Sequence, residues 1–152
     1  MKPLRRLLLT NAAEWSVLFQ ALPLLILVRL SLWIVPFGRI RRAASSLLPR
    51  IARAQREGSL PPERITWLVT VVSRLVPLAH CLTRAIVAQL LLARSGYRAD
   101  LRIGVRKDGN KLDAHAWLML DGRPLFEDAE RLSNYSPFGT SFTSSRDYGN
   151  PT

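Results

Sequence analysis

The chain has 152 residues, enough for one compact domain with an appendage. Its single cysteine, Cys81, excludes an internal disulfide framework and fits a reducing cytoplasm, and with only two histidines it excludes a zinc site built from several thiolates. The net charge of +11 is uneven, because residues 1–60 hold ten basic and two acidic residues (+8) and residues 61–152 hold twelve and nine (+3). The early basic residues alternate with Leu, Ile and Trp, which favours an anionic lipid surface or a partner protein over nucleic acid.

An almost wholly apolar segment, residues 17–35, approaches the length of about 20 residues that a membrane-spanning helix needs. Arg29 lies past its middle, and Gln20 and Pro23 interrupt its start. Basic residues flank the segment on both sides, so the charges assign no orientation, and no small-residue cleavage site of a signal peptide follows. Two interpretations stay open. The segment is either a helix packed against the domain or a partner, or a helix at or marginally inserted in a membrane.

A basic amphipathic stretch follows over residues 39–56, and Pro49 interrupts it. The run Gly58-Ser59-Leu60-Pro61-Pro62 is typical of a linker, with Pro62 near the first position of a new helix. We therefore predict an N-terminal helical region over residues 1–58. Through residues 17–56 this region would contact a partner or the inner face of the membrane, which makes a peripheral location the alternative to a purely cytoplasmic one.

Two helices are expected next. Apolar residues recur at steps of three and four over residues 63–75, which predicts the first. The second begins at Cys81, is apolar nearly all the way round, and ends before Gly96, a natural C-terminal stop. A helix with so little polar surface is expected to lie buried against a sheet.

After Gly96 the apolar period changes to two, which predicts strands. The first strand covers residues 99–105, and Asp108-Gly109-Asn110 is a turn signal. In the second strand, small and apolar residues occupy one face of residues 112–120, while Asp113, His115, Trp117 and Met119 occupy the other. The turn signal Asp121-Gly122 introduces a third strand over residues 123–128. We predict a catalytic core over residues 59–134 and a flexible tail over residues 135–152.

The order of helix with cysteine, strand with histidine and strand with acid has a chemical meaning. A thiol in the first turn of a helix feels the positive end of the helix dipole, which favours the thiolate. His115, 34 residues after Cys81, is placed to accept the thiol proton, and an acid on the neighbouring strand would orient the imidazole. Each residue also has a plain alternative, since lone cysteines are often inert and buried, Trp117 can be a core aromatic, and Asp113 and Asp121 can serve turns.

Four blocks of residues resemble the B-type leader peptidase of lasso peptide biosynthesis, in its stand-alone form: Cys81-Leu82-Thr83-Arg84-Ala85, Leu101-Arg102-Ile103-Gly104-Val105, Ala114-His115-Ala116-Trp117 and Asp121-Gly122-Arg123-Pro124. The blocks cover about residues 63–130. The resemblance implies an α+β fold of the transglutaminase-like and papain-like class. In it, the catalytic cysteine begins a helix packed on a small antiparallel sheet that carries the histidine and the acid.

Carried onto this chain, the resemblance makes Cys81 the nucleophile and His115 the general base and acid. The third residue is usually an aspartate after the Asp-Gly turn, and here the position holds Glu127, with Asp128 as the alternative. No cofactor or metal is implied. The implied partners are a lasso precursor peptide, a separate leader-recognition protein and an ATP-dependent cyclase, with no nucleic acid. An acyl transferase of the same fold, or a non-catalytic membrane-associated scaffold, remains the alternative function.

Overall fold

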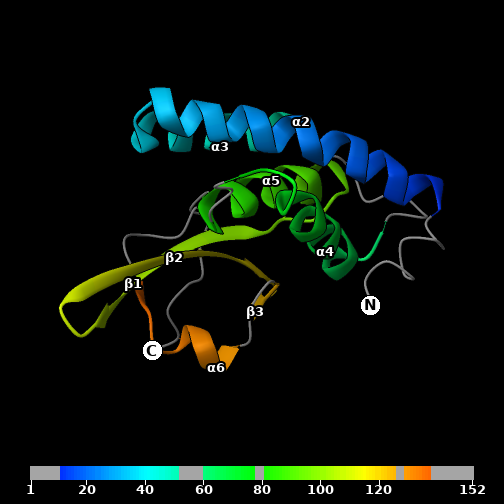
Figure 1. Cartoon of the computed structure of the whole chain (residues 1–152). Coiled ribbons are helices and arrows are strands. Elements are labelled where there is room, and N and C mark those ends of the chain that lie inside the picture. The colour runs from blue at the N-terminus through cyan, green and yellow to red at the C-terminus, as the bar shows by residue number, and fades with distance from the viewer. Residues whose placement is uncertain (1–10, 52–59, 78–80, 126–128, 138–152) are drawn as a thin grey trace, which may run out of the picture.

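The computed structural model describes residues 11–51, 60–77, 81–125 and 129–137. Its elements lie in three layers (Figure 1): α2 and α3 outermost, α4 and α5 in the middle, and a small sheet beneath α5. The elements in chain order are α2 (Ala12–Ile34), α3 (Phe37–Ile51), α4 (Pro62–Ser73), α5 (Cys81–Arg94), β1 (Asp100–Asp108), β2 (Lys111–Leu120), β3 (Arg123–Pro124), α6 (Ala129–Leu132) and β4 (Ser136–Pro137). The α+β class predicted from the sequence is confirmed.

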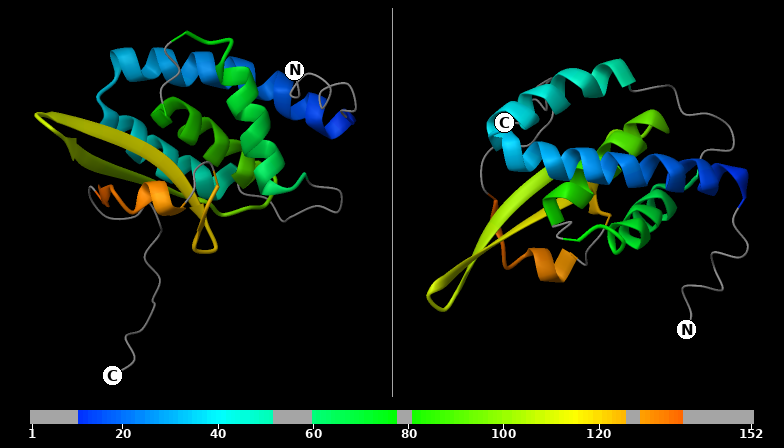
Figure 2. Two further views of the ribbon diagram at one scale, coloured as in Figure 1. Left: turned by 60° about the horizontal axis from the view of Figure 1, so that its bottom comes forward. Right: turned by 45° about the horizontal axis from the view of Figure 1, so that its top comes forward.

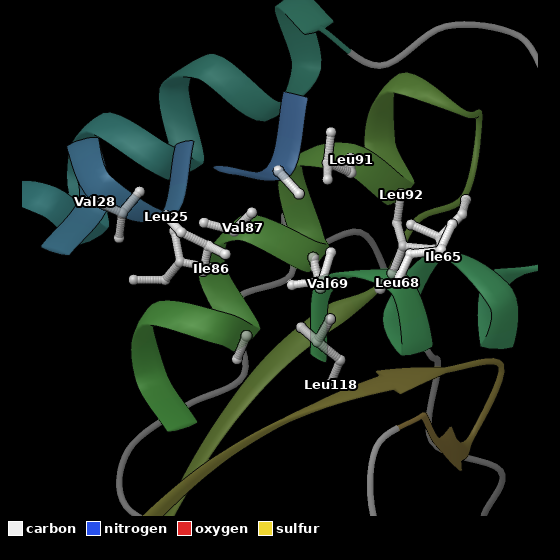
Figure 3. Packing of buried hydrophobic residues seen from close by; sticks show 14 of the residues in the cluster. Leu25, Val28, Ile65, Leu68, Val69, Ile86, Val87, Leu91, Leu92 and Leu118 are labelled. Carbon is white, nitrogen blue, oxygen red and sulfur yellow. The ribbon is translucent and has the colours of Figure 1, made fainter. Parts of the chain in front are cut away.

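The core is built around α5, which contacts α2, α3, α4 and both long strands. Nine of the fourteen residues of α5 are buried, as its nearly all-round apolar surface predicts. Figure 3 shows Leu25 of α2, Leu68 of α4 and Leu118 of β2 converging on this helix from three sides. Burial of each such side chain contributes about 1.5–3 kcal/mol, so the central position of α5 is fixed mainly by apolar packing.

Helix α2 packs on the core through one face. Asn11 caps its start by accepting a hydrogen bond from the Glu14 amide, and the Glu14 carboxylate turns inward to pair with Arg64 of α4. The Arg64 guanidinium in turn lies 4.4 Å from the ring centre of Trp67. This cluster joins α2 to α4 across 50 residues of sequence. Within the described part of the chain, α2 is also the one helix long and apolar enough to cross a membrane.

Pro62 and Pro49 both lie within helices, one at the first position and one in the interior. Pro62 is the first residue of α4, the position at which a missing N–H costs no hydrogen bond, so that prediction is confirmed. Pro49 was expected to interrupt the basic stretch. Instead α3 continues through it to Ile51, and loses the one backbone hydrogen bond that the missing N–H would make.

The sheet has the strand order β3-β2-β1-β4, and each neighbouring pair is antiparallel. The predicted turns connect it: Gly109 joins β1 to β2 with φ of +59°. Asp121 and Gly122, with φ of +49° and +78°, form the two-residue turn to β3. Positive φ at both central residues suits the right-handed twist of a hairpin, which explains why the sequence has Asp-Gly there.

The end of α5 is tied to the start of β1. Gly96 has φ of +91° and stops the helix, as predicted, and the Tyr97 amide then donates to the Leu92 carbonyl. The buried side chain of Gln89 donates from Nε2 to the Ala99 carbonyl at 2.9 Å. The connection between α5 and β1 is therefore short and is held by hydrogen bonds.

The C-terminal part corrects one expectation. The tail was predicted to begin at residue 135, yet Ser136 pairs with Val105 and Pro137 with Gly104, which adds β4 to the free edge of β1. Before it, α6 buries Leu132. A two-residue strand that contains proline has no alternating pattern, so the sequence carried no signal for it.

Candidate active site

Cys81 is the first residue of α5, and its side chain is half-buried against the apolar core. The first N–H groups of a helix have no partner within the helix, so the thiol lies beside backbone donors that the helix itself does not use. These donors can stabilise an oxyanion that develops on a substrate bound at the thiol. Cys81 therefore begins a helix, as the sequence predicted, and its role as the nucleophile stays a prediction. His80, beside it, lies outside the described residues.

His115 lies in the middle of β2, opposite Gly104 of β1. Its neighbours Ala116 and Leu118 are buried and belong to the core that contacts α5, and Figure 3 shows Leu118 pointing toward the helices. Successive side chains of a strand point to opposite faces. His115 and Trp117 are therefore on the face of the sheet that looks away from α5.

On that far face His115 belongs to an aromatic cluster. Its ring centre lies 6.3 Å from that of Trp117, with the two planes only 18° apart, and 5.5 Å from that of Tyr135. Trp117 and Tyr135 are themselves 6.3 Å apart. These spacings are typical of favourable aromatic pairs, so the cluster holds the imidazole in a fixed position.

Gly104 makes room for the cluster. A Cβ at this position would lie 2.8 Å from Cη2 of Trp117 and 3.0 Å from Cβ of Tyr135, closer than real side chains approach. The glycine therefore allows Trp117 and Tyr135 to approach β1 closely beside His115. The sequence analysis placed Gly104 in a strand without assigning it this role.

An ionic network continues the cluster along the same face. Asp113, two residues before His115, accepts hydrogen bonds from the Tyr135 hydroxyl at 2.7 Å and from Nη2 of Arg106 at 3.0 Å. The hydrogen bond from Tyr135 holds the pKa of Asp113 below its ordinary value, and Arg106 and His115 act in the same direction while burial opposes them. The expectation that Asp113 serves a turn is wrong, because it lies on β2. Its partners, 7 and 22 residues away, gave no local signal.

The predicted third catalytic residue, Glu127 or its alternative Asp128, lies outside the described residues. The chain reaches the edge of the sheet just before them, where Arg123 and Pro124 of β3 pair with Leu120 and Met119 of β2. Asp121, by contrast, does serve the turn, as expected. The acid stays a prediction.

The structure thus brings some predicted residues together and not others. It joins His115 with Trp117, Tyr135 and the Asp113 network, and it joins Cys81 with the core under α5. The His115 ring is on the face of β2 that looks away from α5, whereas Cys81 begins α5. Contact between thiol and imidazole requires the ring to reach the helix side of the sheet, so the nucleophile–base pair stays a prediction. No group of three His, Cys, Asp or Glu side chains in the described ranges could hold a metal ion.

Comparison with known proteins gives the family of the chain. A family model, described as the transglutaminase-like superfamily, matches residues 24–140. No curated protein and no solved structure matched the chain. The match spans every described helix and strand from the middle of α2 to β4, including Cys81 at the start of α5 and His115 on β2. The chain therefore belongs to the transglutaminase-like superfamily.

Proposed function

We propose that the protein is a cysteine peptidase that removes the leader from a lasso peptide precursor. The observation that carries the proposal is Cys81 as the first residue of the buried helix α5, inside a domain of the transglutaminase-like superfamily. Membership of that superfamily suggests cysteine peptidase or acyltransferase activity. The finer assignment to a leader peptidase rests on the four sequence blocks that resemble the lasso B-type protein.

The chemistry follows from the thiol. The Cys81 thiolate attacks the carbonyl of the last leader residue, and backbone N–H groups at the start of α5 stabilise the oxyanion. Collapse of this intermediate breaks the scissile amide bond, and the imidazole passes the thiol proton to the departing amine, which is the new N-terminus of the core peptide. Water then hydrolyses the thioester, releases the leader as a carboxylate and restores the thiol. The freed amine is the group that a separate ATP-dependent cyclase would use to close a ring.

The test is a reaction of the purified chain with a synthetic precursor and the leader-binding protein, followed by mass spectrometry. Free leader and free core are expected, with a thioester-linked leader on Cys81 after acid quenching. Cys81→Ala should abolish both, and Thr83→Ser, in the same helical turn, is the matched control that should keep them. A leader–amine conjugate in place of free leader would instead establish an acyl transferase. Unchanged pathway output with Cys81→Ala would establish a scaffold.

The acid can be identified by the same assay. Glu127→Gln should lower turnover at least about tenfold more than Asp128→Asn, because an orienting carboxylate fixes the tautomer of the base. The reverse order would assign the role to Asp128. Equal, mild losses would mean that neither residue orients the base, and Asp113→Asn would then be the next variant to measure.

A further inference from the structure

Helix α2 is apolar on the side that faces away from the protein as well as on the side that packs against it. Its inner face buries Ala21 and Leu25 completely. The opposite stripe, which we call the outer α2 face, presents large apolar side chains to solvent, and Phe19 and Trp33 are 73% and 78% exposed. The outer α2 face consists of Trp15, Phe19, Ile26, Leu30 and Trp33.

This stripe runs the full length of a 23-residue helix, about 34 Å at 1.5 Å per residue. Single exposed apolar residues are normal on proteins, but a continuous apolar strip of this length marks a contact with another phase or molecule. The two tryptophans lie near opposite ends of the helix. Tryptophan is the side chain enriched at the boundary between lipid headgroups and acyl chains.

The charge next to this strip is positive. Helix α3 lies beside α2 on the side of α5 that faces away from the sheet, as both Figure 1 and Figure 2 show. It exposes Arg39, Arg42 and Arg50, and its sequence contains no acidic residue. The one acidic residue of α2, Glu14, is turned inward to Arg64. The outer layer therefore combines apolar and cationic surface without an exposed carboxylate on either helix.

We propose that this layer docks on an anionic lipid bilayer. The outer α2 face enters the boundary between headgroups and acyl chains, and the α3 arginines contact the lipid phosphates. Charge complementarity selects this occupant over a second copy of the chain, because a symmetric dimer through α2 and α3 would bring the arginines of both copies together.

The helix lies on the bilayer and does not span it. Spanning would withdraw Ala21 and Leu25 from the core and break the Glu14–Arg64 ion pair. Docking keeps the contacts of α2 with the protein core and buries only the outer α2 face, which is exposed to solvent. An ordinary interfacial helix has a polar face that contacts water. In α2 the corresponding face packs on the protein core instead.

The test is flotation of the full chain with phosphatidylcholine vesicles and with vesicles that also contain phosphatidylglycerol. Binding is expected to the anionic vesicles only, to weaken with added salt, and to be lost in a carbonate wash. The double variant Arg39→Gln/Arg42→Gln should weaken binding about fivefold per arginine, whereas Arg94→Gln/Arg98→Gln, at exposed positions outside α2 and α3, should not.

The apolar contribution of the outer α2 face is tested by a second variant with a matched control. Phe19→Ser should weaken binding about tenfold or more, and Leu112→Ser, at an equally exposed leucine on β2, should leave it unchanged. Equal binding to neutral and anionic vesicles, resistance to carbonate, or a dimer in place of lipid binding would each overturn the proposal. Because Cys81→Ala should bind vesicles normally, failure of lipid docking and failure of the peptidase proposal are separable.

Discussion

The two faces of strand β2 have different surroundings: one packs in the apolar core, and the other carries the aromatic cluster of His115. On the face toward α5, Ala116 and Leu118 are buried among helices in dry apolar packing. On the far face, His115 and Trp117 meet Tyr135 in a cluster with hydrogen-bonded and charged neighbours. One alternating sequence therefore supplies stability through its even positions and a polar, aromatic site through its odd ones. A shift of the strand by one residue would exchange the two roles, so packing of the core also fixes where the imidazole lies.

The largest effect is expected from a test of whether His115, on the face of β2 that looks away from α5, acts as the base for the Cys81 thiol. The chain holds two histidines, so His115→Ala and His80→Ala identify the base. We expect His115→Ala to lower kcat/KM for leader cleavage about 10²- to 10⁴-fold, the usual contribution of a general acid–base, and His80→Ala to change it little. The opposite result would assign the base to His80 and leave the far face without a part in catalysis.

The helix face is tested by its most buried residue. Leu118→Ala should lower the free energy of unfolding by about 2–5 kcal/mol, because it leaves a cavity under α5. Leu112→Ala, on the same strand but 78% exposed, should change it by no more than about 0.5 kcal/mol. Urea denaturation measures both. Leu112 lies on the same face as Leu118 but away from the core, so similar losses for the two variants would mean that burial in the core does not set the contribution of this face to stability.

The far face depends on the absence of a side chain at one position. Gly104→Ala places a Cβ within 2.8 Å of the Trp117 ring, and overpacking of this kind costs about 1–3 kcal/mol. Gly38→Ala in α3 is the control, since no atom lies within 4 Å of the new Cβ and alanine favours a helix. Thermal unfolding should show a lower Tm for the first and an equal or higher Tm for the second. A neutral Gly104→Ala would show that the aromatic cluster is loosely packed.

The smallest effect is expected from the ionic network. In Tyr135→Phe the pKa of Asp113 should rise toward its ordinary value of about 3.9, because the strongest hydrogen bond to the carboxylate is lost. A carboxyl group whose pKa is lower in the folded state than in the unfolded state stabilises the fold at any pH above the unfolded pKa. This stabilisation is lost as the pH falls through the folded pKa. The variant should therefore lose less stability on acidification than the natural chain. An NMR titration of the Asp113 carboxyl carbon that gives the same pKa in both proteins would contradict this.

Local patterns in the sequence predicted much of this fold. Alternation gave β1 and β2, Asp121-Gly122 gave the turn, and Gly96 gave the end of α5, because in each case the determinant lies within a few residues. Tyr135 was missed as a neighbour of His115. A short strand with proline has no period, and the pairing that brings Tyr135 to the cluster is made by residues far apart in the chain.

The candidate site shows the same limit. Cys81 could be placed at a helix start from its own neighbours, and His115 could be placed on the less apolar face of its strand. Which sheet face α5 covers depends on side chains from four elements packed together, so no local pattern carries it. That long-range packing decides on which side of the sheet the imidazole lies relative to α5.

The ion pair between Glu14 and Arg64 has a consequence for the order of events during synthesis. The ribosome releases α2 first, while the partner of Glu14 follows 50 residues later and the last residue of α5 lies at position 94. In that interval the residues of α2 have neither α4 nor α5 to pack against. The inner face of α2, with Ala21 and Leu25, therefore gains its native packing only after residue 94 has been made.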